Sequence, residues 1–245
     1  VHFQKLNENL GFAGGSNAGV RYCLDRGADW VWLLNNDTEP DKESLANLAQ
    51  FAATEPKAGV LGAVVHTPDN GVLVESGTGS IDFKKAKTFE RGQVDHTVPT
   101  QTCQWLSGCN LFFRAQAFIE LGGFDASFFL YFEDADLCHR LNKAGWSCLL
   151  VPAASIKHIG GVSTGESLSV WRSYYHTRNR IHFFMRHSDP SARPQVLLTI
   201  GLHLLRHLLV LPFRGKRGRR QLKAELLGLR DYLQGKLGKA DCLDF

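Results

Sequence analysis

Apolar residues follow two kinds of pattern along this chain. Continuous apolar runs, which are typical of buried β-strands, occur at residues 30–34, 59–65 and 147–151, and shorter runs occur at 1–6, 72–75 and 105–114. Between these runs, apolar positions at helical spacing predict helices near residues 17–24, 41–51, 115–121, 134–144, 171–186 and 195–211. Strands that alternate with helices in this way indicate an α/β fold.

The strand at residues 30–34 ends abruptly in two amides and a carboxylate, Asn35, Asn36 and Asp37. This pattern predicts a buried parallel strand whose carboxyl end opens on a crevice. Ligands of open α/β sheets lie in such crevices. Asp37 is therefore the first residue that we expect to take part in chemistry.

Residues 7–17 hold three glycines and three asparagines. They predict a tight loop between a strand at 1–6 and a helix that Ser16 or Asn17 caps. A glycine-rich turn of this kind can bind phosphate through its N–H groups, and an ordinary turn explains the composition equally well.

An acidic cluster follows an aromatic run at residues 128–132 and comprises Glu133, Asp134 and Asp136. Near a helix N-terminus each acid also complements the helix dipole, and Asp136 has Arg140 four residues later as an ordinary ion-pair partner. Asp134 is the functional candidate, because the preceding aromatic residues suggest a walled pocket that can tune its pKa.

His158 follows a short strand and precedes Gly160 and Gly161. A lone histidine is more often structural than a ligand. Together with Asp37, however, His158 could bind a hard cation that carries a diphosphate. The polar segment 77–102 fits two interpretations, a functional flap or a mobile insertion.

Composition narrows the protein class. With 245 residues, 44% of them hydrophobic and 21% charged, the chain is a folded protein, and its net charge of +4 is too small to indicate nucleic-acid binding. Its six cysteines have no CxxC spacing, which favours a reduced, cytoplasmic protein without a zinc site. The chain begins at Val1 without a signal sequence, and we expect a fragment or a trimmed chain.

The C-terminal part predicts an amphipathic region. Residues 195–211 are apolar except for one narrow stripe made of Thr199, His203, Arg206 and His207. This run falls short of the roughly 20 apolar residues of a membrane span. A helix in the membrane interface fits better, with the basic residues 214–223 on anionic headgroups; a helical pair packed on the catalytic domain is the alternative. A leucine stripe comprises Leu222, Leu226, Leu229, Leu233 and Leu237. We expect domains at 1–187 and 188–245.

Taken together, these motifs resemble those of the glycosyltransferase family 2 enzymes, particularly the rhamnosyltransferase-like branch. The matching segments cover about residues 1–187 and lie in the expected order: Asn9 to Gly19, Leu34 to Thr38, Gly122 to Asp125, Glu133 to Leu137 with Arg140, and His158 with Gly161 and Ser163.

The resemblance implies a GT-A fold, Rossmann-like with a mostly parallel sheet flanked by helices, and inverting transfer from a nucleotide-diphosphate sugar. It implies Asp134 as the base, and Asp37 with His158 at an Mg²⁺ or Mn²⁺ ion. It places Gly14, Gly15, Asn17, Asn36 and Asp37 at the donor. It places Trp105, Gly108 and Glu133 on the acceptor side. Asn35 and Asn36 stand where other members carry acids, which implies weaker metal affinity.

The expected function is synthesis of a bacterial cell-surface polysaccharide, with a saccharide or polyprenyl-linked acceptor, at the cytoplasmic face of the plasma membrane. The strands that open the family's domain and grip the nucleotide base do not precede Val1. An inactive or partial fragment therefore stays open as an alternative. So does a nucleotidyl or phosphoryl transferase acting on sugar nucleotides, while sugar, nucleotide and acceptor stay unassigned.

Overall fold

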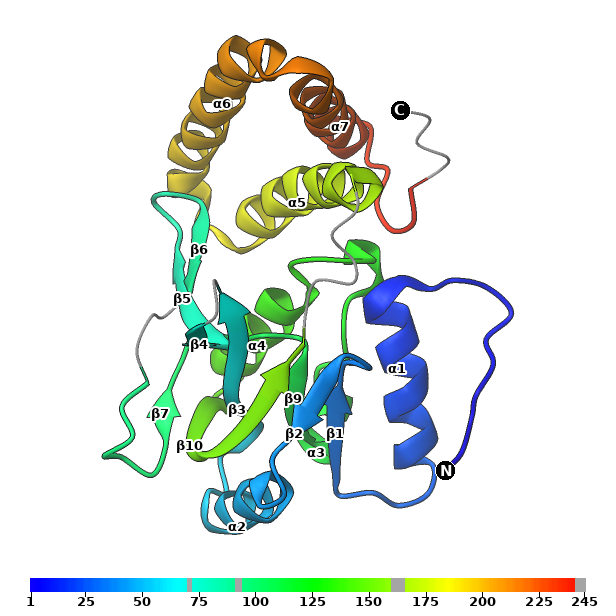
Figure 1. Cartoon of the computed structure of the whole chain (residues 1–245), viewed down its shortest axis with the longest axis vertical. Helices are drawn as coiled ribbons and strands as arrows, with labels where there is room; N and C mark the ends of the chain where they lie inside the picture. Colours follow the sequence, from blue (N-terminus) through cyan, green and yellow to red (C-terminus); the bar gives the residue numbers. More distant parts are fainter. Residues whose placement is uncertain (70–71, 91–93, 160–165, 241–245) are drawn as a thin grey trace. The chain divides into compact units, whose positions relative to one another are not determined.

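The computed structural model describes residues 1–69, 72–90, 94–159 and 166–240 (Figure 1). The chain forms two compact units. Unit 1 comprises Val1–Ser80, Phe89–Asp125 and Glu133–Gly160, and unit 2 comprises Ile81–Thr88, Ala126–Phe132 and Gly161–Phe245. The boundary predicted at residue 187 stays a prediction; the helix α5 (Glu166–His187), which precedes it, belongs to unit 2.

Unit 1 is built on a mixed sheet in which five strands follow the order β1-β9-β3-β10-β2, while β4 pairs with β3 and β7 pairs with β10. The strands are β1 (Trp30–Leu34), β2 (Thr38–Pro40), β3 (Ala58–Asp69), β4 (Val72–Ser76), β7 (Gln101–Thr102), β9 (Asn110–Arg114) and β10 (Ser147–His158). The apolar runs at 30–34, 59–65, 72–75 and 147–151 are thus confirmed as strands.

The expectation of a mostly parallel sheet is wrong for the described pairings. Only β3 and β10 pair in parallel, whereas β9 lies between β1 and β3 and runs antiparallel to both. The chain reaches β9 after residues 77–109 and enters the sheet in the opposite direction. β9 therefore separates β1 and β3, which point the same way. β1, β3 and β10 therefore still point in one direction.

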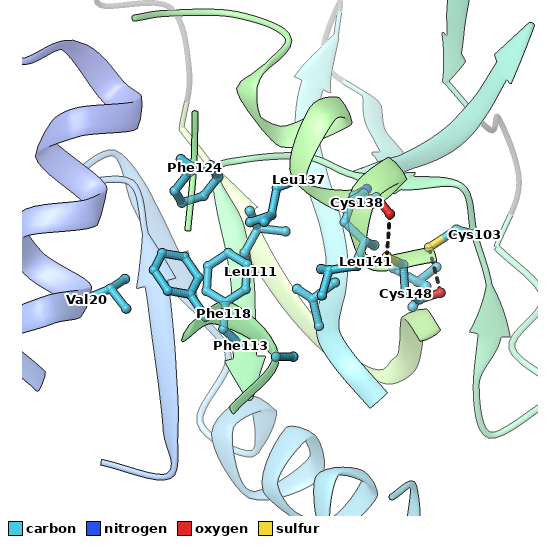
Figure 2. Close-up of a cluster of buried hydrophobic side chains, with 14 of the residues drawn as sticks. Val20, Cys103, Leu111, Phe113, Phe118, Phe124, Leu137, Cys138, Leu141 and Cys148 are labelled. Carbon is cyan, nitrogen blue, oxygen red and sulfur yellow. Dashed lines mark hydrogen bonds between the residues drawn. The ribbon is translucent and has the colours of Figure 1, made fainter. Parts of the chain in front are cut away.

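The described part of unit 1 contains four α-helices: α1 (Gly11–Leu24), α2 (Ser44–Thr54), α3 (Ala115–Glu120) and α4 (Glu133–Lys143). One apolar cluster joins α1, α3 and α4 to the sheet through Val20, Phe118 and Leu137 (Figure 2). A second cluster packs α2 on the sheet through Leu48. The five cysteines in the described part of the chain are free thiols, as expected, and Cys242 lies outside it.

The N-terminal expectations are wrong. Residues 1–6 form no strand and are almost wholly exposed, because no described strand pairs with them. The predicted glycine loop is instead the start of α1, whose first residue, Gly11, has a φ of +70° and donates its N–H to Asn9 Oδ1 at 2.9 Å. Leu10, rather than Ser16 or Asn17, is the N-cap residue.

Two further boundaries differ from the prediction. Pro40 belongs to β2, so α2 begins at Ser44 and buries Leu48 but leaves Leu45 exposed. Residues 77–102, expected to be irregular, contain short strands. A second sheet has the order β6-β5-β8, formed by β5 (Thr78–Asp82), β6 (Lys87–Glu90) and β8 (Trp105–Leu106).

Among its described residues, unit 2 contains three long helices, α5 (Glu166–His187), α6 (Arg193–Val210) and α7 (Gly215–Leu233), linked by the 3₁₀ turns η2 (Pro190–Ala192) and η3 (Leu211–Arg214). A third 3₁₀ turn, η1 (Ala126–Phe128), comes earlier in the chain. The helices predicted at 171–186 and 195–211 are confirmed.

The predicted leucine stripe is divided between buried and exposed positions of α7. The buried positions include Gly218, Leu222, Glu225, Gly228 and Asp231, whereas Leu226 and Leu233 are exposed. Small and polar residues occupy much of the buried face because α5 approaches closely. A Cβ at Gly228 would lie 2.6 Å from the carbonyl oxygen of Tyr174 on α5. The Tyr174 hydroxyl donates to Asp231 at 2.7 Å.

Candidate active site

The pairing of β2 with β10 brings Asp37 to His158. Thr38 lies opposite His158 in this antiparallel pair, and the N–H of Ile159 donates to the carbonyl oxygen of Asp37 at 2.9 Å. As a result, Asp37 Oδ1 lies 3.2 Å from His158 Nε2. Both atoms are buried, and apart from this contact neither has a hydrogen-bond partner within the part of the chain that the structure describes.

Two buried, unsatisfied ligand atoms side by side suit a divalent cation, since a carboxylate oxygen and an imidazole nitrogen are ordinary ligands of such ions. No group of three or more His, Cys, Asp or Glu side chains that could hold a metal occurs among the described residues. Any ion here would therefore complete its coordination with oxygens from a bound substrate and water. This donor set fits an ion that binds together with a diphosphate.

Asp134 stands at the start of α4 and is partly buried. Its Oδ2 accepts a hydrogen bond from the backbone N–H of Gly108 at 3.0 Å, and its Oδ1 accepts from the N–H of Ala135 at 2.7 Å. Desolvation raises the pKa of this carboxyl, and the two backbone hydrogen bonds act in the opposite direction. The result is a fixed carboxylate with raised basicity.

The segment that carries Gly108 also borders Asp37. The N–H of Asn35, two residues before Asp37, donates to the carbonyl oxygen of Cys109 at 3.1 Å. Burial raises the pKa of the Cys109 thiol to about 11, and the negative charges of Asp134 and Asp37 both add to that rise. The two carboxylates singled out in the sequence thus act on one thiol. No sequence signal had pointed to Cys109.

Glu133 is deeply buried, 5% exposed, and its Oε2 has no hydrogen-bond partner among the described residues. Desolvation, together with the neighbouring Asp134 and Asp136, raises its pKa well above the usual range. Its predicted place on the acceptor side stays a prediction, and in this structure the side chain faces the protein interior.

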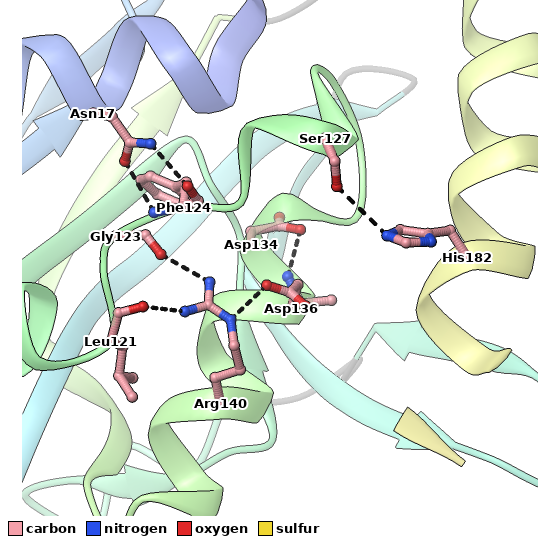
Figure 3. A network of polar contacts seen from close by, with 10 residues as sticks. Asn17, Leu121, Gly123, Phe124, Ser127, Asp134, Asp136, Arg140 and His182 are labelled. Atoms are coloured by element: carbon pink, nitrogen blue, oxygen red, sulfur yellow. Dashed lines mark hydrogen bonds and ion pairs between the residues drawn. The ribbon is translucent and has the colours of Figure 1, made fainter. Parts of the chain in front are cut away.

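The predicted ion pair of Asp136 with Arg140 is confirmed, with 2.7 Å between Oδ2 and Nε (Figure 3). Arg140 also donates to the carbonyl oxygens of Leu121 and Gly123, at 2.9 and 2.8 Å, and so ties α4 to the turn at the end of α3. Asp136 is fully buried. Its role in this structure is to hold α4 in place.

Asn17 holds the same turn to α1. Its Nδ2 donates to the carbonyl oxygen of Phe124 at 2.8 Å, and its Oδ1 accepts from the N–H of Phe124 at 2.9 Å (Figure 3). The amide is thereby paired in both directions. Donor binding by Asn17 stays a prediction.

The other predicted residues are spread over unit 1. Gly14 and Gly15 lie in the first turns of α1, and a Cβ at Gly15 would meet no atom within 4 Å. Asn36 is exposed beside Asp37. Trp105 donates its Nε1 proton to the carbonyl oxygen of Ser80 at 3.3 Å. Gly161 and Ser163 lie outside the described residues.

Sequence reasoning missed a strained segment directly before Glu133. Phe129, Tyr131 and Phe132 all have positive φ, at 61°, 68° and 74°. In unit 2, Asn179 Nδ2 lies 2.7–2.9 Å from three carbonyl oxygens of this segment, those of Phe128, Leu130 and Tyr131. The signal in the sequence was a pair of polar residues, Arg178 and Asn179, inside an aromatic helix.

Known proteins resemble this chain in sequence and in fold. Residues 30–214 match the family described as Glycosyl transferase family group 2. The chain is 32% identical over 209 residues to N-acetylglucosaminyl-diphospho-decaprenol L-rhamnosyltransferase of Mycobacterium tuberculosis, which covers 80% of this chain and 68% of that protein. It is 25% identical over 191 residues to the low-salt glycan biosynthesis hexosyltransferase Agl10 of Haloferax volcanii, covering 74% of this chain and 59% of the relative.

Two solved structures share the fold. The structure of GalNAc-T7 with UDP, GalNAc and Mn²⁺ superposes with a TM-score of 0.55 at 11% identity, over 81% of this chain and 42% of that one. The mannosyltransferase PcManGT of Pyrobaculum calidifontis, in complex with GDP-Man and Mn²⁺, gives a TM-score of 0.51 at 14% identity, over 96% and 69%. The GT-A fold implied by the sequence resemblance is confirmed.

Proposed function

The chain belongs to glycosyl transferase family group 2, and we propose that it is an inverting enzyme that moves a rhamnosyl or hexosyl unit from a nucleotide-diphosphate sugar to a lipid-linked saccharide. The observation that carries the proposal is the Asp134 carboxylate, fixed on the Gly108–Cys109 segment that also borders Asp37. This arrangement places a base, Asp134, and a group that can hold the leaving diphosphate through a metal ion, Asp37, within a single unit of the protein.

The relatives support the substrate class. The mycobacterial relative is named for transfer of L-rhamnose to a diphospho-decaprenol-linked sugar, and the archaeal relative is named a hexosyltransferase of glycan biosynthesis. A saccharide carried on a polyprenyl diphosphate is accordingly the acceptor class that we propose for this chain. We accordingly propose that the chain acts in the assembly of a surface polysaccharide.

Asp134 is proposed as the general base. It takes the proton from the acceptor hydroxyl while the hydroxyl oxygen forms a bond to the sugar C1, and the bond from C1 to the nucleoside diphosphate breaks on the opposite face. Configuration at C1 is thereby inverted. A raised pKa suits this role, because a base works best when its pKa approaches the working pH, and such a base contributes about 10²–10⁴-fold.

Asp37 and His158 are proposed to hold an Mg²⁺ or Mn²⁺ ion, which when bound neutralises charge on the donor diphosphate. Asn36 follows Asn35 where a second carboxylate would strengthen binding, so we expect modest affinity for the free ion. Gly14, Gly15 and Asn17 on the donor side, and Trp105, Gly108 and Glu133 on the acceptor side, remain proposed substrate contacts.

A membrane surface is the proposed location, at the cytoplasmic face. By length and composition alone, the helical stretch Pro190–Leu233 is long and apolar enough to cross a membrane, whereas the run at 195–211 taken by itself is expected to fall short of a span. The exposed leucines of α6 and the basic start of α7 also suit a helix pair lying on anionic lipid.

The test is a transfer assay with a panel of nucleotide-diphosphate sugars, Mn²⁺ and an N-acetylglucosaminyl-diphospho-lipid acceptor. We expect one donor to give a glycosylated lipid with inverted configuration and a nucleoside diphosphate. Release of a sugar 1-phosphate and nucleotide transfer would instead indicate a nucleotidyl transferase. Absence of donor binding by calorimetry would indicate an inactive fragment.

A further inference from the structure

Unit 2 contains a cavity of about 350 Å³ that the proposed chemistry does not use. Its lining residues come from all three long helices, α5, α6 and α7. A volume of this size lies within the range of about 300–1,000 Å³ that is usual for small-ligand sites. A smaller cavity of about 200 Å³ adjoins it and shares His176, Arg180 and His203.

The lining of the larger cavity is strongly basic. It includes the guanidinium groups of Arg172 and Arg180 from α5 and of Arg217 from α7. Among the described residues that line the cavity, Glu225 is the sole carboxylate, and it is already paired: His207 Nδ1 lies 2.8 Å from its Oε2, and Gln221 donates to its Oε1 at 3.0 Å. Three arginine side chains thus line a cavity whose one carboxylate is already paired, and this excess of positive charge favours an anionic ligand.

Parts of the wall are fixed in position before any ligand binds. Glu225 is buried, and its contact with His207 joins α7 to α6. Arg180 Nε donates to the carbonyl oxygen of Ala86 at 2.6 Å, which holds its guanidinium at the cavity. Planar guanidinium groups held in this way match phosphate oxygens in geometry as well as charge.

The pKa values of two histidines reflect the same positive charges. Desolvation, followed by the positive charges of Arg180 and Arg172, lowers the pKa of His176 to about 4. Desolvation and then His207, Arg180, Arg206 and Lys87 lower the pKa of His203 to about 4. Both rings are therefore neutral at pH 7, and a bound anion would favour their protonation.

The helix that closes the cavity has an apolar outer face. Ile200, His203, Leu204 and His207 of α6 line the cavity at helical spacing, whereas Leu198, Leu202, Leu205 and Leu209 are exposed on other faces of the helix. One helix thus offers cationic surroundings inside and a hydrocarbon surface outside. This combination fits a molecule with a charged head and a long apolar tail.

We propose that the cavity between α5, α6 and α7 binds the diphosphate of a prenyl-diphosphate lipid, whose hydrocarbon chain lies along the exposed leucines of α6. The inference rests on the proposed function in that this lipid would be the carrier of the acceptor sugar. The assigned residues are Arg172, Arg180 and Arg217 as phosphate ligands, with His176 and His203 as adjoining donors.

Calorimetry on the full chain, without sugar nucleotide, tests the site with three probes: farnesyl diphosphate, inorganic pyrophosphate and farnesol. We expect farnesyl diphosphate to bind at least roughly tenfold more tightly than either of the others, because only it offers both charge and tail. R172Q and R217Q should each weaken its binding by roughly tenfold. K216Q removes the neighbouring charge on α7 outside the cavity lining and should change binding less than about twofold.

Every other result counts against the site. Equal effects of K216Q and R217Q would show a diffuse basic surface, equal binding of pyrophosphate would show a phosphate site without a lipid, and equal binding of farnesol would show an apolar surface alone. Histidine NMR gives an independent readout in unmodified protein: the pKa values of His176 and His203 should rise when farnesyl diphosphate binds. The calorimetry and the NMR titration need neither a sugar donor nor turnover. Failure of the transfer assay would therefore not alter the binding that they measure.

Discussion

Asp134 Oδ2 accepts a 3.0 Å hydrogen bond from the backbone N–H of Gly108, the residue before the thiol whose pKa both Asp37 and Asp134 raise. A backbone donor holds the carboxylate in one orientation without supplying a positive charge that would abolish its basicity. Desolvation raises the pKa further than this hydrogen bond lowers it. The geometry therefore favours a carboxylate that accepts a proton more readily than an exposed aspartate does.

We expect Asp134→Asn to reduce glycosyl transfer by about 10²–10⁴-fold, the usual contribution of a general base, while the dissociation constant for the donor stays within about twofold. The amide oxygen can still accept from Gly108, so folding should be preserved. Turnover and donor calorimetry measure the two effects. Asp136→Asn is the comparison: it breaks the ion pair with Arg140 and should lower thermal stability. Undiminished turnover in Asp134→Asn would refute the assignment.

Glu133→Gln should stabilise the fold at pH 7–8. Burial raises the folded-state pKa of Glu133 above the ordinary 4.5, so between those two values the folded state binds more protons than the unfolded state. Stability conferred by the protonated acid is therefore present at low pH and lost as pH rises through the folded-state pKa. The melting temperature of Glu133→Gln should exceed that of the unmodified protein at pH 8 and converge with it near pH 4.

The exposed Glu8 provides the control for that experiment, because Glu8→Gln removes an equal charge without a buried group. Its melting curve should follow that of the unmodified protein across the whole pH range. A Glu133→Gln variant that is destabilised at pH 8 would mean that the carboxylate has a partner outside the described residues.

Asp37→Asn should raise the Mn²⁺ concentration needed for half-maximal nucleoside-diphosphate binding by at least roughly tenfold, because a neutral amide replaces the carboxylate that pairs with His158. Calorimetric titration of Mn²⁺ into protein with nucleoside diphosphate measures this without turnover. Glu39→Gln removes an exposed charge two residues away on β2 and should have little effect. Equal metal dependence in all three proteins would exclude Asp37 as a ligand.

Much of this site could be predicted because its signals are local. The apolar run at 30–34, followed by two amides and Asp37, predicted β1 and its polar end. The four-residue spacing of Asp136 and Arg140 predicted an ion pair within one helix turn. The roles of Asp37, Asp134 and His158 came from family motifs, and the structure brings Asp37 to His158 through the pairing of β2 with β10.

What could not be predicted depends on tertiary packing. Glycines at 14 and 15 read as loop residues, yet they lie in α1, where Asn17 is anchored to Phe124. The direction of β9 depends on the route of the chain through two sheets, which apolar runs do not encode. The buried side of α7 combines Leu222 with small and polar residues, since Gly228 allows α5 to approach.

Asn179→Ala should lower the free energy of unfolding by a few kcal/mol, since the carbonyl oxygens of Leu130 and Tyr131 lose this donor at about 1–3 kcal/mol each, whereas the carbonyl oxygen of Phe128 keeps Arg178 as a donor. It should also reduce turnover, because the strained segment that Asn179 holds runs directly into Glu133 and Asp134. Urea unfolding followed by fluorescence gives the first quantity. The exposed Asn142, which makes one hydrogen bond to Gln104, is the control, and Asn142→Ala should cost less than about 1 kcal/mol. Similar losses in both variants would contradict a special role for Asn179.

Replacing the exposed leucines of α6 should detach the protein from lipid. Leu202, Leu205 and Leu209 are 57%, 50% and 63% exposed, so changing all three to glutamine leaves the described packing of unit 2 intact. Burial of a leucine side chain contributes about 1.5–3 kcal/mol, and partial insertion of three should make binding to anionic vesicles at least roughly tenfold weaker in the variant. Vesicle sedimentation measures this.

A double replacement of Leu226 and Leu233 by glutamine is the matched control, because these α7 leucines are also exposed but lie apart from the α6 stripe. If α6 is the contact surface, the control should keep most of its binding, and added salt should weaken both proteins through the basic residues that begin α7. Equal loss in the two variants would assign contact to the whole helical pair. Undiminished sedimentation of the α6 variant at low and high salt would rule out membrane contact through this helix.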